Sequence, residues 1–117
     1  MELAAQIMVG VVAAIHVYIL VLEMFLWRTD RVRATFGTTS EFAAASAALA
    51  ANQGLYNGFL AAGLVYGLIA DSFAFQVFFL CCVIVAGIYG ALTANRRILF
   101  VQVVPGGLAL LLVLLAQ

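Results

Sequence analysis

Charged side chains are scarce in this chain of 117 residues: they make up 9% of it, whereas about 25% is usual in soluble domains. Lysine is absent, and the five arginines are balanced by five acidic residues, so the formal net charge is zero. A chain without a basic face lacks the electrostatic footprint of a nucleic-acid-binding protein. Low charge with high hydrophobicity also excludes intrinsic disorder, which has the reverse composition.

Cysteine and proline are rare as well, with two cysteines and one proline in the chain. Cys81 and Cys82 are neighbours within an apolar run, and there is no cysteine elsewhere for either to pair with. Because adjacent cysteines rarely bridge each other, we interpret both as small hydrophobic residues. They therefore give no indication of the redox compartment.

Hydrophobic residues, by contrast, make up 68% of the chain. A soluble domain of this size has too little interior to bury them. The first apolar run lacks a basic segment before it and is too long for a secretory signal peptide. We therefore predict a multi-pass membrane protein, in which four spans of about 20 residues each would account for the apolar content.

Polar stretches divide the apolar sequence into four runs, which predict an all-α, antiparallel, up-down-up-down four-helix transmembrane bundle with a kinked fourth helix. Thr38 followed by Glu41 fits a capping box, so we expect the second long helix to begin near Thr39. The whole chain, 1–117, forms a single membrane domain on this prediction. The expected spans cover residues 3–27, 43–70, 73–94 and 98–116, with a cytoplasmic loop at 28–40.

The arginines set the predicted orientation, because they lie only in the first and third connections between spans. The second connection carries Asp71, and both tails lack arginine and lysine. The positive-inside rule then places both termini outside the cytoplasm of a bacterial inner membrane. The arginines concerned are Arg28, Arg31, Arg33, Arg96 and Arg97.

The few polar residues of the predicted spans concentrate in the cytoplasmic half of the membrane. At about 1.5 Å per residue, His16 lies level with Asn57, and Glu23 lies nearest to Asn52 and Gln53. An ionisable residue within a span is costly and by default marks a functional interior. The candidate ligand-binding or proton-coupling residues are His16, Glu23, Asn52, Gln53, Tyr56, Asn57, Tyr89 and Gln102.

Several of these residues also have a purely structural interpretation. His16 alone is compatible with an interhelical hydrogen bond, and Asn52, Gln53 and Asn57 with polar contacts that hold helices together. Glu23 is near enough to the inner interface to snorkel or to pair with Arg28. Their matched depth favours a polar cavity over this interpretation.

Small residues predict close contacts between helices. The pairs Gly54/Gly58 and Gly63/Gly67 each form a GxxxG motif, which lets helix backbones approach closely. Pro105 lacks an amide hydrogen and frees a carbonyl group in the preceding turn, which explains the expected kink. Because so thin a bundle cannot easily enclose a wide cavity alone, we expect a homo-oligomer, either a dimer or a trimer.

Several segments resemble a bacterial family of small four-helix membrane proteins, known as a domain of unknown function, number thirteen hundred and four. The resemblance covers nearly the whole chain and implies an integral four-helix protein without an assigned activity. The residues that carry it are His16, Glu23 with Met24–Trp27, the segment NQGLYNGFLA at 52–61, AGIYG at 86–90 and QVVPG at 102–106.

Two other membrane families share part of this pattern. Small multidrug transporters have four spans and a functional glutamate in the first, but Glu23 lies too near the inner end and their aromatic-glycine signatures are missing. The membrane-associated eicosanoid and glutathione enzymes have an Asn-x-x-Glu-Asn-like run in their second helix. The run at 52–57 is similar, but Tyr56 stands where the acid would be, and the arginine-rich thiol-binding set is largely missing. This likeness implies shared architecture with different chemistry.

Three functions remain open from the sequence. The preferred one is binding or transport of a small amphipathic or lipid-soluble molecule, with Glu23 carrying charge and His16 titrating if the process is proton-coupled. The first alternative is a membrane-embedded enzyme that acts on a lipid-soluble substrate, with Glu23 or His16 as general acid or base. The second is a structural or assembly subunit. We predict no metal site and no cofactor, because His16 and Glu23 supply only two ligands.

Overall fold

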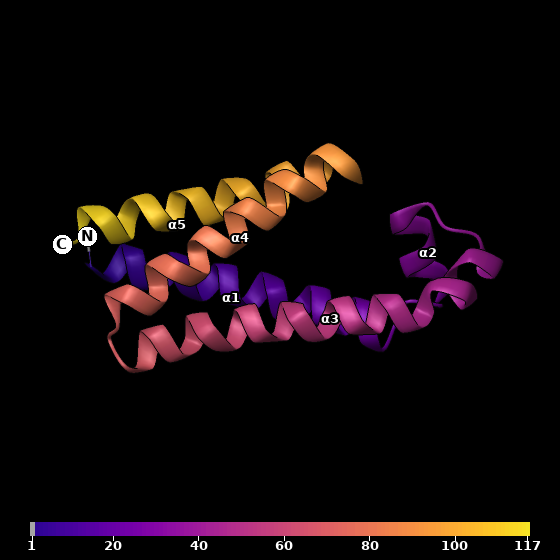
Figure 1. The fold of residues 1–117 in the computed structure, drawn as a ribbon, viewed down its shortest axis with the longest axis horizontal. Helices are drawn as coiled ribbons and strands as arrows, with labels where there is room; N and C mark the ends of the chain where they lie inside the picture. Colours follow the sequence, from indigo (N-terminus) through magenta and orange to yellow (C-terminus); the bar gives the residue numbers. More distant parts are fainter. Residues whose placement is uncertain (1) are drawn as a thin grey trace. The chain divides into compact units, whose positions relative to one another are not determined.

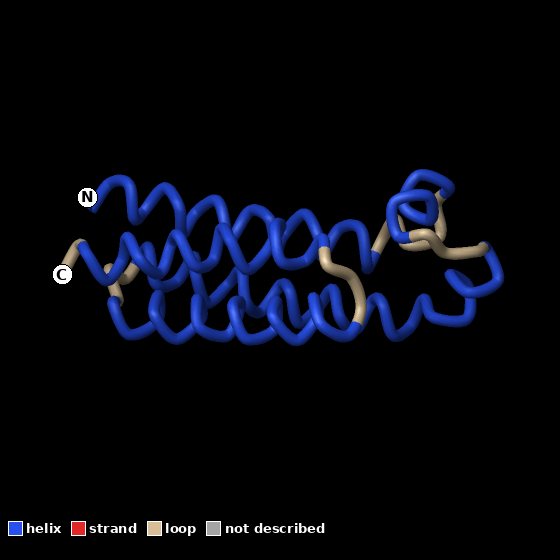
Figure 2. The backbone as a smooth tube through the Cα atoms, turned by 90° about the horizontal axis from the view of Figure 1, so that it is seen from above, coloured by secondary structure: helices blue, strands red, loops and turns tan. Residues whose placement is uncertain are grey.

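The computed structural model describes residues 2–117, and every regular element in that range is helical (Figures 1 and 2). The predicted all-α class is therefore confirmed. The long helices follow the apolar runs, and α3 and α4 end close to the polar residues after them, whereas α1 ends at Met24, before the apolar run reaches Arg28. The helical elements are α1 (Glu2–Met24), α2 (Asp30–Phe36), α3 (Ser40–Ile69), α4 (Phe73–Thr93), the π-helical segment η1 (Leu99–Val103) and α5 (Val104–Leu115).

Helix α3 begins one residue away from the predicted cap. The hydroxyl of Thr39, not that of Thr38, accepts the amide hydrogen of Phe42 at 3.1 Å. The amide of Thr38 is engaged in ending the preceding helix, since it donates to the carbonyl oxygen of Arg33 at 3.0 Å. Helix α4 is capped in the same way as α3, by Ser72, whose hydroxyl accepts from the amide of Phe75 at 3.2 Å.

The predicted loop at 28–40 contains the short helix α2. Its N-cap is Thr29, whose hydroxyl accepts from the amide of Val32 at 3.4 Å. It ends at Gly37, which has a φ of 69°, a left-handed conformation that glycine adopts without a steric penalty. The ring of Phe36 packs 5.1 Å from the ring of Trp27. A helix of seven residues is too short to show a hydrophobic period, so only its cap residues, Thr29 and Gly37, indicate it in the sequence.

The chain divides into two compact units, and α1 and α3 each pass from one to the other. One unit holds the described residues up to Ile15 together with Leu60–Gln117, and the other holds His16–Phe59. The core of the first unit draws on all of its long helical segments. Its buried residues are Ala5, Val9, Val12, Ala13, Leu64, Leu80, Val83, Ala109 and Val113.

Glycines bring the helices of the first unit close together, as the GxxxG motifs predict. The ring of Phe79 in α4 occupies the space that a side chain at Gly63 in α3 would need. On α5, a Cβ atom at Gly106 would lie 3.1 Å from Cγ1 of Val83. Gly63 and Gly106 are both buried, so the absence of a side chain there sets the distance between helices.

The fourth apolar run is interrupted just before its proline. Leu99–Val103 form a π-helix, and the amide of Val104 donates to the carbonyl oxygen of Leu99, five residues earlier. Pro105 follows at once and has no amide hydrogen to continue the regular pattern. The irregularity that the sequence predicts at Pro105 is thus a change of hydrogen-bond register.

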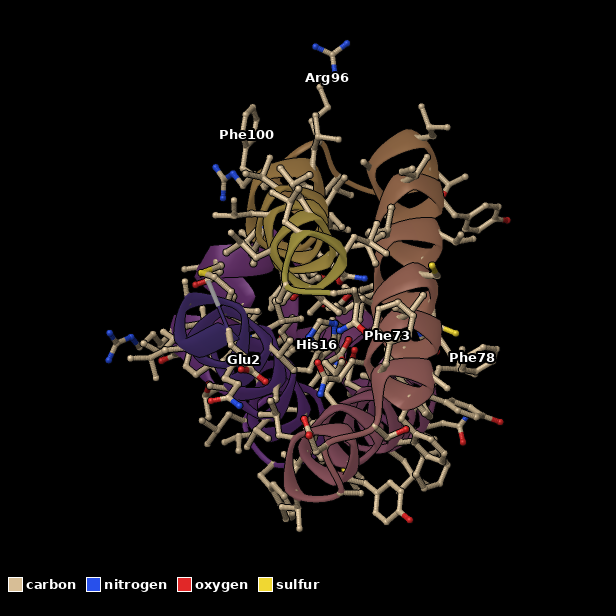
Figure 3. The ribbon with its side chains drawn as sticks, turned by 90° about the vertical axis from the view of Figure 1, so that its left-hand side faces the viewer. Glu2, His16, Phe73, Phe78, Arg96 and Phe100 are labelled. Atoms are coloured by element: carbon tan, nitrogen blue, oxygen red, sulfur yellow. The ribbon has the colours of Figure 1, made fainter. Side chains whose placement is uncertain are left out.

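By length and composition, α1 and α4 can each cross a membrane, since the most apolar 18-residue stretch of each has a mean hydropathy of 2.3. The apolar segment Leu99–Leu115 is shorter, and α3 contains polar residues that lower its hydropathy. Large apolar side chains point away from the helices of the first unit, among them Phe78 and Phe100 (Figure 3).

Candidate functional site

Within the second unit, a hydrogen bond joins Glu23 of α1 to Asn57 of α3. The Nδ2 atom of Asn57 donates to Oε1 of Glu23 at 2.7 Å. The same Nδ2 atom donates to the backbone oxygen of Gln53 at 3.2 Å, which fixes the carboxamide along its own helix. Both Glu23 and Asn57 are half-buried. Two of the predicted site residues, 34 positions apart in the chain, therefore meet directly.

Glycines on α3 allow this contact. A Cβ atom at Gly54 would lie 2.6 Å from Cγ of Met24 and 3.2 Å from the backbone oxygen of Leu20, both on α1. A Cβ atom at Gly58 would lie 2.7 Å from Cδ1 of Leu20. Side chains at these positions would push the helices apart. The glycine pair thus brings the short carboxamide of Asn57 within reach of Glu23.

The depth estimate from the sequence places Glu23 at the correct level, because a Cβ atom at Gly54, the residue after Gln53, would lie 3.2 Å from Cβ of Glu23. The estimate did not predict the pairing, since the carboxyl group of Glu23 accepts a hydrogen bond from Asn57, one helical turn further along α3 than Gln53. Asn52 and Gln53 are exposed on α3, and only the backbone oxygen of Gln53 contributes to the hydrogen bonds described here.

The pair retains hydrogen-bonding capacity beyond the contact between its members. Oε2 of Glu23 and Oδ1 of Asn57 make no hydrogen bond within residues 2–117. Both atoms are acceptors when the glutamate is ionised, and Oε2 becomes a donor when a proton is added to it. A molecule with a hydroxyl, amide or ammonium group has the chemistry to bind them.

The remaining candidates of this unit differ sharply in exposure. His16 is completely buried and lies seven residues before Glu23 on α1, which is about two helical turns. Tyr56 is 54% exposed, and its ring makes an edge contact with Phe59. The interior of the unit thus contains His16, while Tyr56 belongs to its surface.

Tyr89 and Gln102 belong to the first unit. Nε2 of Gln102 donates to the backbone oxygen of Val83 at 2.9 Å and so connects the π-helical segment to α4. Its side chain passes Gly87, where a Cβ atom would lie 3.1 Å from Cγ of Gln102. Tyr89 is 71% exposed. Gln102 therefore joins the π-helical segment to α4.

Two polar contacts were missed by the sequence prediction. Nε1 of Trp27 donates to the hydroxyl of Ser46 at 3.1 Å, which links the end of α1 to the beginning of α3. In the first unit, Gln76 is buried and its Nε2 donates to the backbone oxygen of Gly67 at 3.0 Å. Gln76 is a carboxamide near the start of an apolar run, and this position alone could have identified it as a candidate polar residue of the interior.

No group of three or more metal-ligating side chains occurs within residues 2–117.

Comparisons with known proteins identify relatives. The family model described as "Protein of unknown function (DUF1304)" matches residues 10–114. The chain is 34% identical over 98 residues to the "Uncharacterized protein YpaA" of Lactococcus lactis subsp. lactis (strain IL1403), a match that covers 80% of each chain. No solved structure shows a significant match.

Proposed function

Because the chain belongs to the DUF1304 family of proteins of unknown function, we propose a function from the site itself: a protein of the bacterial inner membrane that binds or transports a small amphipathic or lipid-soluble molecule. The molecule binds at the Glu23–Asn57 pair. The hydrogen bond of 2.7 Å between these side chains is the observation that carries the proposal.

The position of the pair supports this function. Glu23 lies one residue before the end of a 23-residue helix whose most apolar 18 residues have a mean hydropathy of 2.3. A carboxyl group in such apolar surroundings costs free energy, and an ionisable residue kept there by default indicates a functional site. Its free oxygen and that of Asn57 form a polar edge on an apolar background, which suits a ligand of the same mixed character.

The proposed membrane topology has four antiparallel spans, with α3 and the segment 99–115 crossing beside α1 and α4. The arginines at positions 28–33 and 96–97 then lie in the cytoplasm, and both termini lie outside. A homo-oligomer, dimer or trimer, shields the polar faces of α3 from lipid. Proton coupling is part of the proposal, with His16 as the second titrating group on the face of α1 that carries Glu23.

Native mass spectrometry of the protein, released from its own membranes, tests the proposal. We expect a bound non-protein mass, which Glu23→Gln depletes strongly because the replacement cannot bear charge. The matched control is Glu41→Gln, the same substitution at an exposed position in the first turn of α3. A bound mass that is unaffected by Glu23→Gln, or equally depleted by both variants, would sink the proposal.

A structural or assembly subunit is the second candidate, and the packing at Gly54 favours it. The close approach of α1 and α3 at Gly54 gives the Glu23–Asn57 hydrogen bond a role in holding the helices together. On this alternative, Glu23→Gln lowers thermal stability or disturbs assembly and leaves any bound molecule in place. Measuring both quantities on the same sample separates the two candidates.

A further inference from the structure

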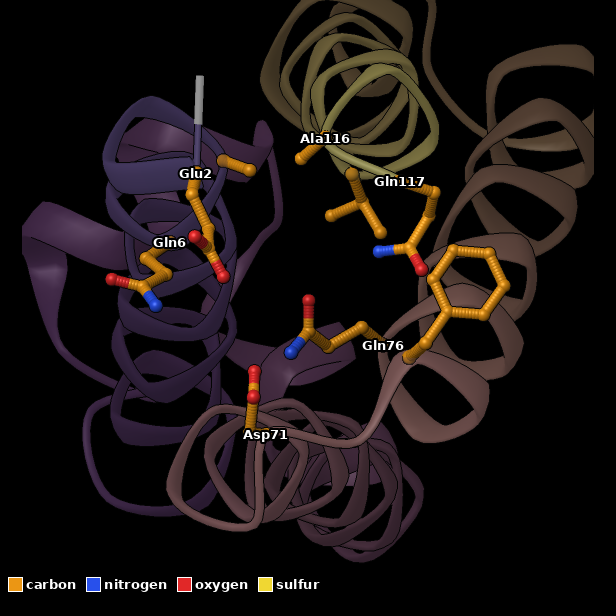
Figure 4. A pocket seen from close by; sticks show the side chains of 9 residues that line it. Glu2, Gln6, Asp71, Gln76, Ala116 and Gln117 are labelled. Atoms are coloured by element: carbon orange, nitrogen blue, oxygen red, sulfur yellow. The ribbon is translucent and has the colours of Figure 1, made fainter.

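The first unit contains a cavity of about 290 Å³, remote in sequence from Glu23. It opens where α1 begins, where the turn between α3 and α4 lies, and where α5 ends (Figure 4). No property proposed for Glu23 depends on it. Residues that line it include Glu2, Gln6, Asp71, Phe73, Gln76 and Val113.

The side chain of Gln76 is held in a defined orientation at the buried side of this cavity. It is only 9% exposed, and its Nε2 atom donates to the backbone oxygen of Gly67 at 3.0 Å. A carbonyl oxygen only accepts hydrogen bonds, so the nitrogen of the carboxamide must face Gly67. The oxygen of Gln76 is therefore held toward the cavity (Figure 4), where it has no hydrogen-bond partner within residues 2–117. This acceptor is accessible from the cavity and suits a ligand that donates a hydrogen bond.

The charges around the opening are of one sign. Glu2 comes from the first turn of α1, and Asp71 from the turn after α3. No arginine or histidine lines the cavity among the residues that the structure describes. Two carboxylates and the Gln76 oxygen thus surround one space, and nothing in its lining neutralises them. Such a surface attracts cations.

Backbone hydrogen bonds define the turn that carries Asp71. Asp71 has a φ of 49°, a left-handed conformation that aspartate and asparagine adopt more readily than most residues. Its amide donates to the backbone oxygen of Leu68 at 3.2 Å, and the next amide, of Ser72, donates to that of Gly67 at 2.8 Å. Gly67 therefore anchors both the turn that carries Asp71 and the side chain of Gln76.

We propose that this cavity binds a small organic ammonium compound. An ammonium group has three donors, and the site offers three acceptor groups, the carboxylates of Glu2 and Asp71 and the carboxamide oxygen of Gln76. The apolar side chains of Ala5, Phe73 and Val113 also line the cavity and suit a short alkyl or aryl group. A bare metal ion fits less well, because no group of three or more His, Cys, Asp or Glu side chains occurs within residues 2–117.

Methyl NMR of the full chain in lipid nanodiscs tests this site with benzylammonium chloride as the probe. We expect saturable shifts of the Ala5 and Ala116 methyl signals, both of which belong to residues that line the cavity. Asp71→Asn should raise the dissociation constant roughly fivefold, as expected for one solvent-exposed carboxylate. Asparagine also tolerates the left-handed conformation, so this variant keeps the turn. Glu2→Gln provides an independent second measurement with the same expected effect.

The controls separate charge recognition from partition into lipid. Benzyl alcohol has a similar size and no charge, so it should not produce the saturable shifts. Glu41→Gln should leave the dissociation constant unchanged, because Glu41 does not line the cavity. Equal shifts with benzyl alcohol, shifts that never saturate, or a double variant Glu2→Gln/Asp71→Asn with unchanged affinity would each overturn the proposal.

Discussion

At the scale of single residues, the Glu23–Asn57 hydrogen bond is the contact with the most consequences. It joins a half-buried carboxyl group on an apolar helix to a carboxamide that the backbone of Gln53 already orients. A hydrogen bond of this kind restricts both side chains and keeps the carboxyl group at a fixed place. Removing its donor leaves the acceptor in apolar surroundings with reduced compensation.

Asn57→Ala should therefore destabilise the protein by about 0.6–1.7 kcal/mol, the range measured for polar contacts between membrane helices. The free energy of unfolding, obtained by titration with denaturing detergent and followed by circular dichroism, checks this value. Asn52→Ala is the matched control, since Asn52 is exposed on the same helix. Equal losses in the two variants would mean that the bond to Glu23 contributes nothing.

At the scale of helices, glycine determines which faces meet. In the second unit, Gly54 and Gly58 place α3 against Leu20 and Met24 of α1. In the first unit, Gly63 accepts the ring of Phe79. Two GxxxG motifs on one helix thus serve two different partners, α1 and α4.

Gly54→Ala should destabilise the protein by about 1–3 kcal/mol, the usual cost of overpacking. The added Cβ would lie 3.2 Å from the backbone oxygen of Leu20, which cannot move aside as a side chain does. Gly10→Ala is the control within α1, because no atom lies within 4 Å of a Cβ placed there. It should be neutral or stabilising by about 0.5–1 kcal/mol. Thermal unfolding of both variants measures the difference, and destabilisation by Gly10→Ala alone would contradict the packing described.

At the scale of the whole molecule, the distribution of arginine is the strongest asymmetry. All the basic residues except His16 lie in two connections, and the turn at Asp71 has none. Trp27 lies beside Arg28, as expected for a helix end at a membrane interface. The proposed topology follows from this bias.

Labelling with a membrane-impermeant maleimide tests the topology in intact cells. In a background with Cys81→Ala and Cys82→Ala, Ala70→Cys should react from outside, because Ala70 precedes the turn at Asp71 and is exposed. Thr35→Cys, on the exposed surface of α2, should react only after the membrane is opened. Labelling of both positions from the same side would refute the four-span arrangement.

Much of the helical structure could be predicted, because each long helix follows an apolar run that ends at polar residues. The bounds of α4, Phe73–Thr93, differ from the expected 73–94 by a single residue. Helix α2 could not be found by periodicity, since it is too short, and it depends on the hydroxyl of Thr29 and the conformation of Gly37. The cap at Thr39 was missed because neighbouring threonines compete for the same role, and the amide of Thr38 closes the helix before it.

The sequence predicted which residues belong to the candidate site better than it predicted which of them form a hydrogen bond. Intramembrane polarity selected Glu23 and Asn57, and the structure joins them. The count along the chain also gave the level of Glu23, which lies against Gly54. Which side chain Glu23 pairs with depends on side-chain direction and length, which such a count does not contain. Gln76 lies outside the predicted polar band and was not among the candidates, although a buried carboxamide in an apolar helix follows the same physical rule.

The π-helical segment before Pro105 contains one residue more than a regular α-helical turn would. The extra residue rotates the side chains of the helix that follows by about 100° about the helix axis, relative to a regular helix. Deleting one residue within Leu99–Val103 would let the segment relax into an ordinary α-helix and rotate Gln102 away from the oxygen of Val83. A single-residue change in length at this point therefore acts as a rotation of the helix, and it changes which residues face α4.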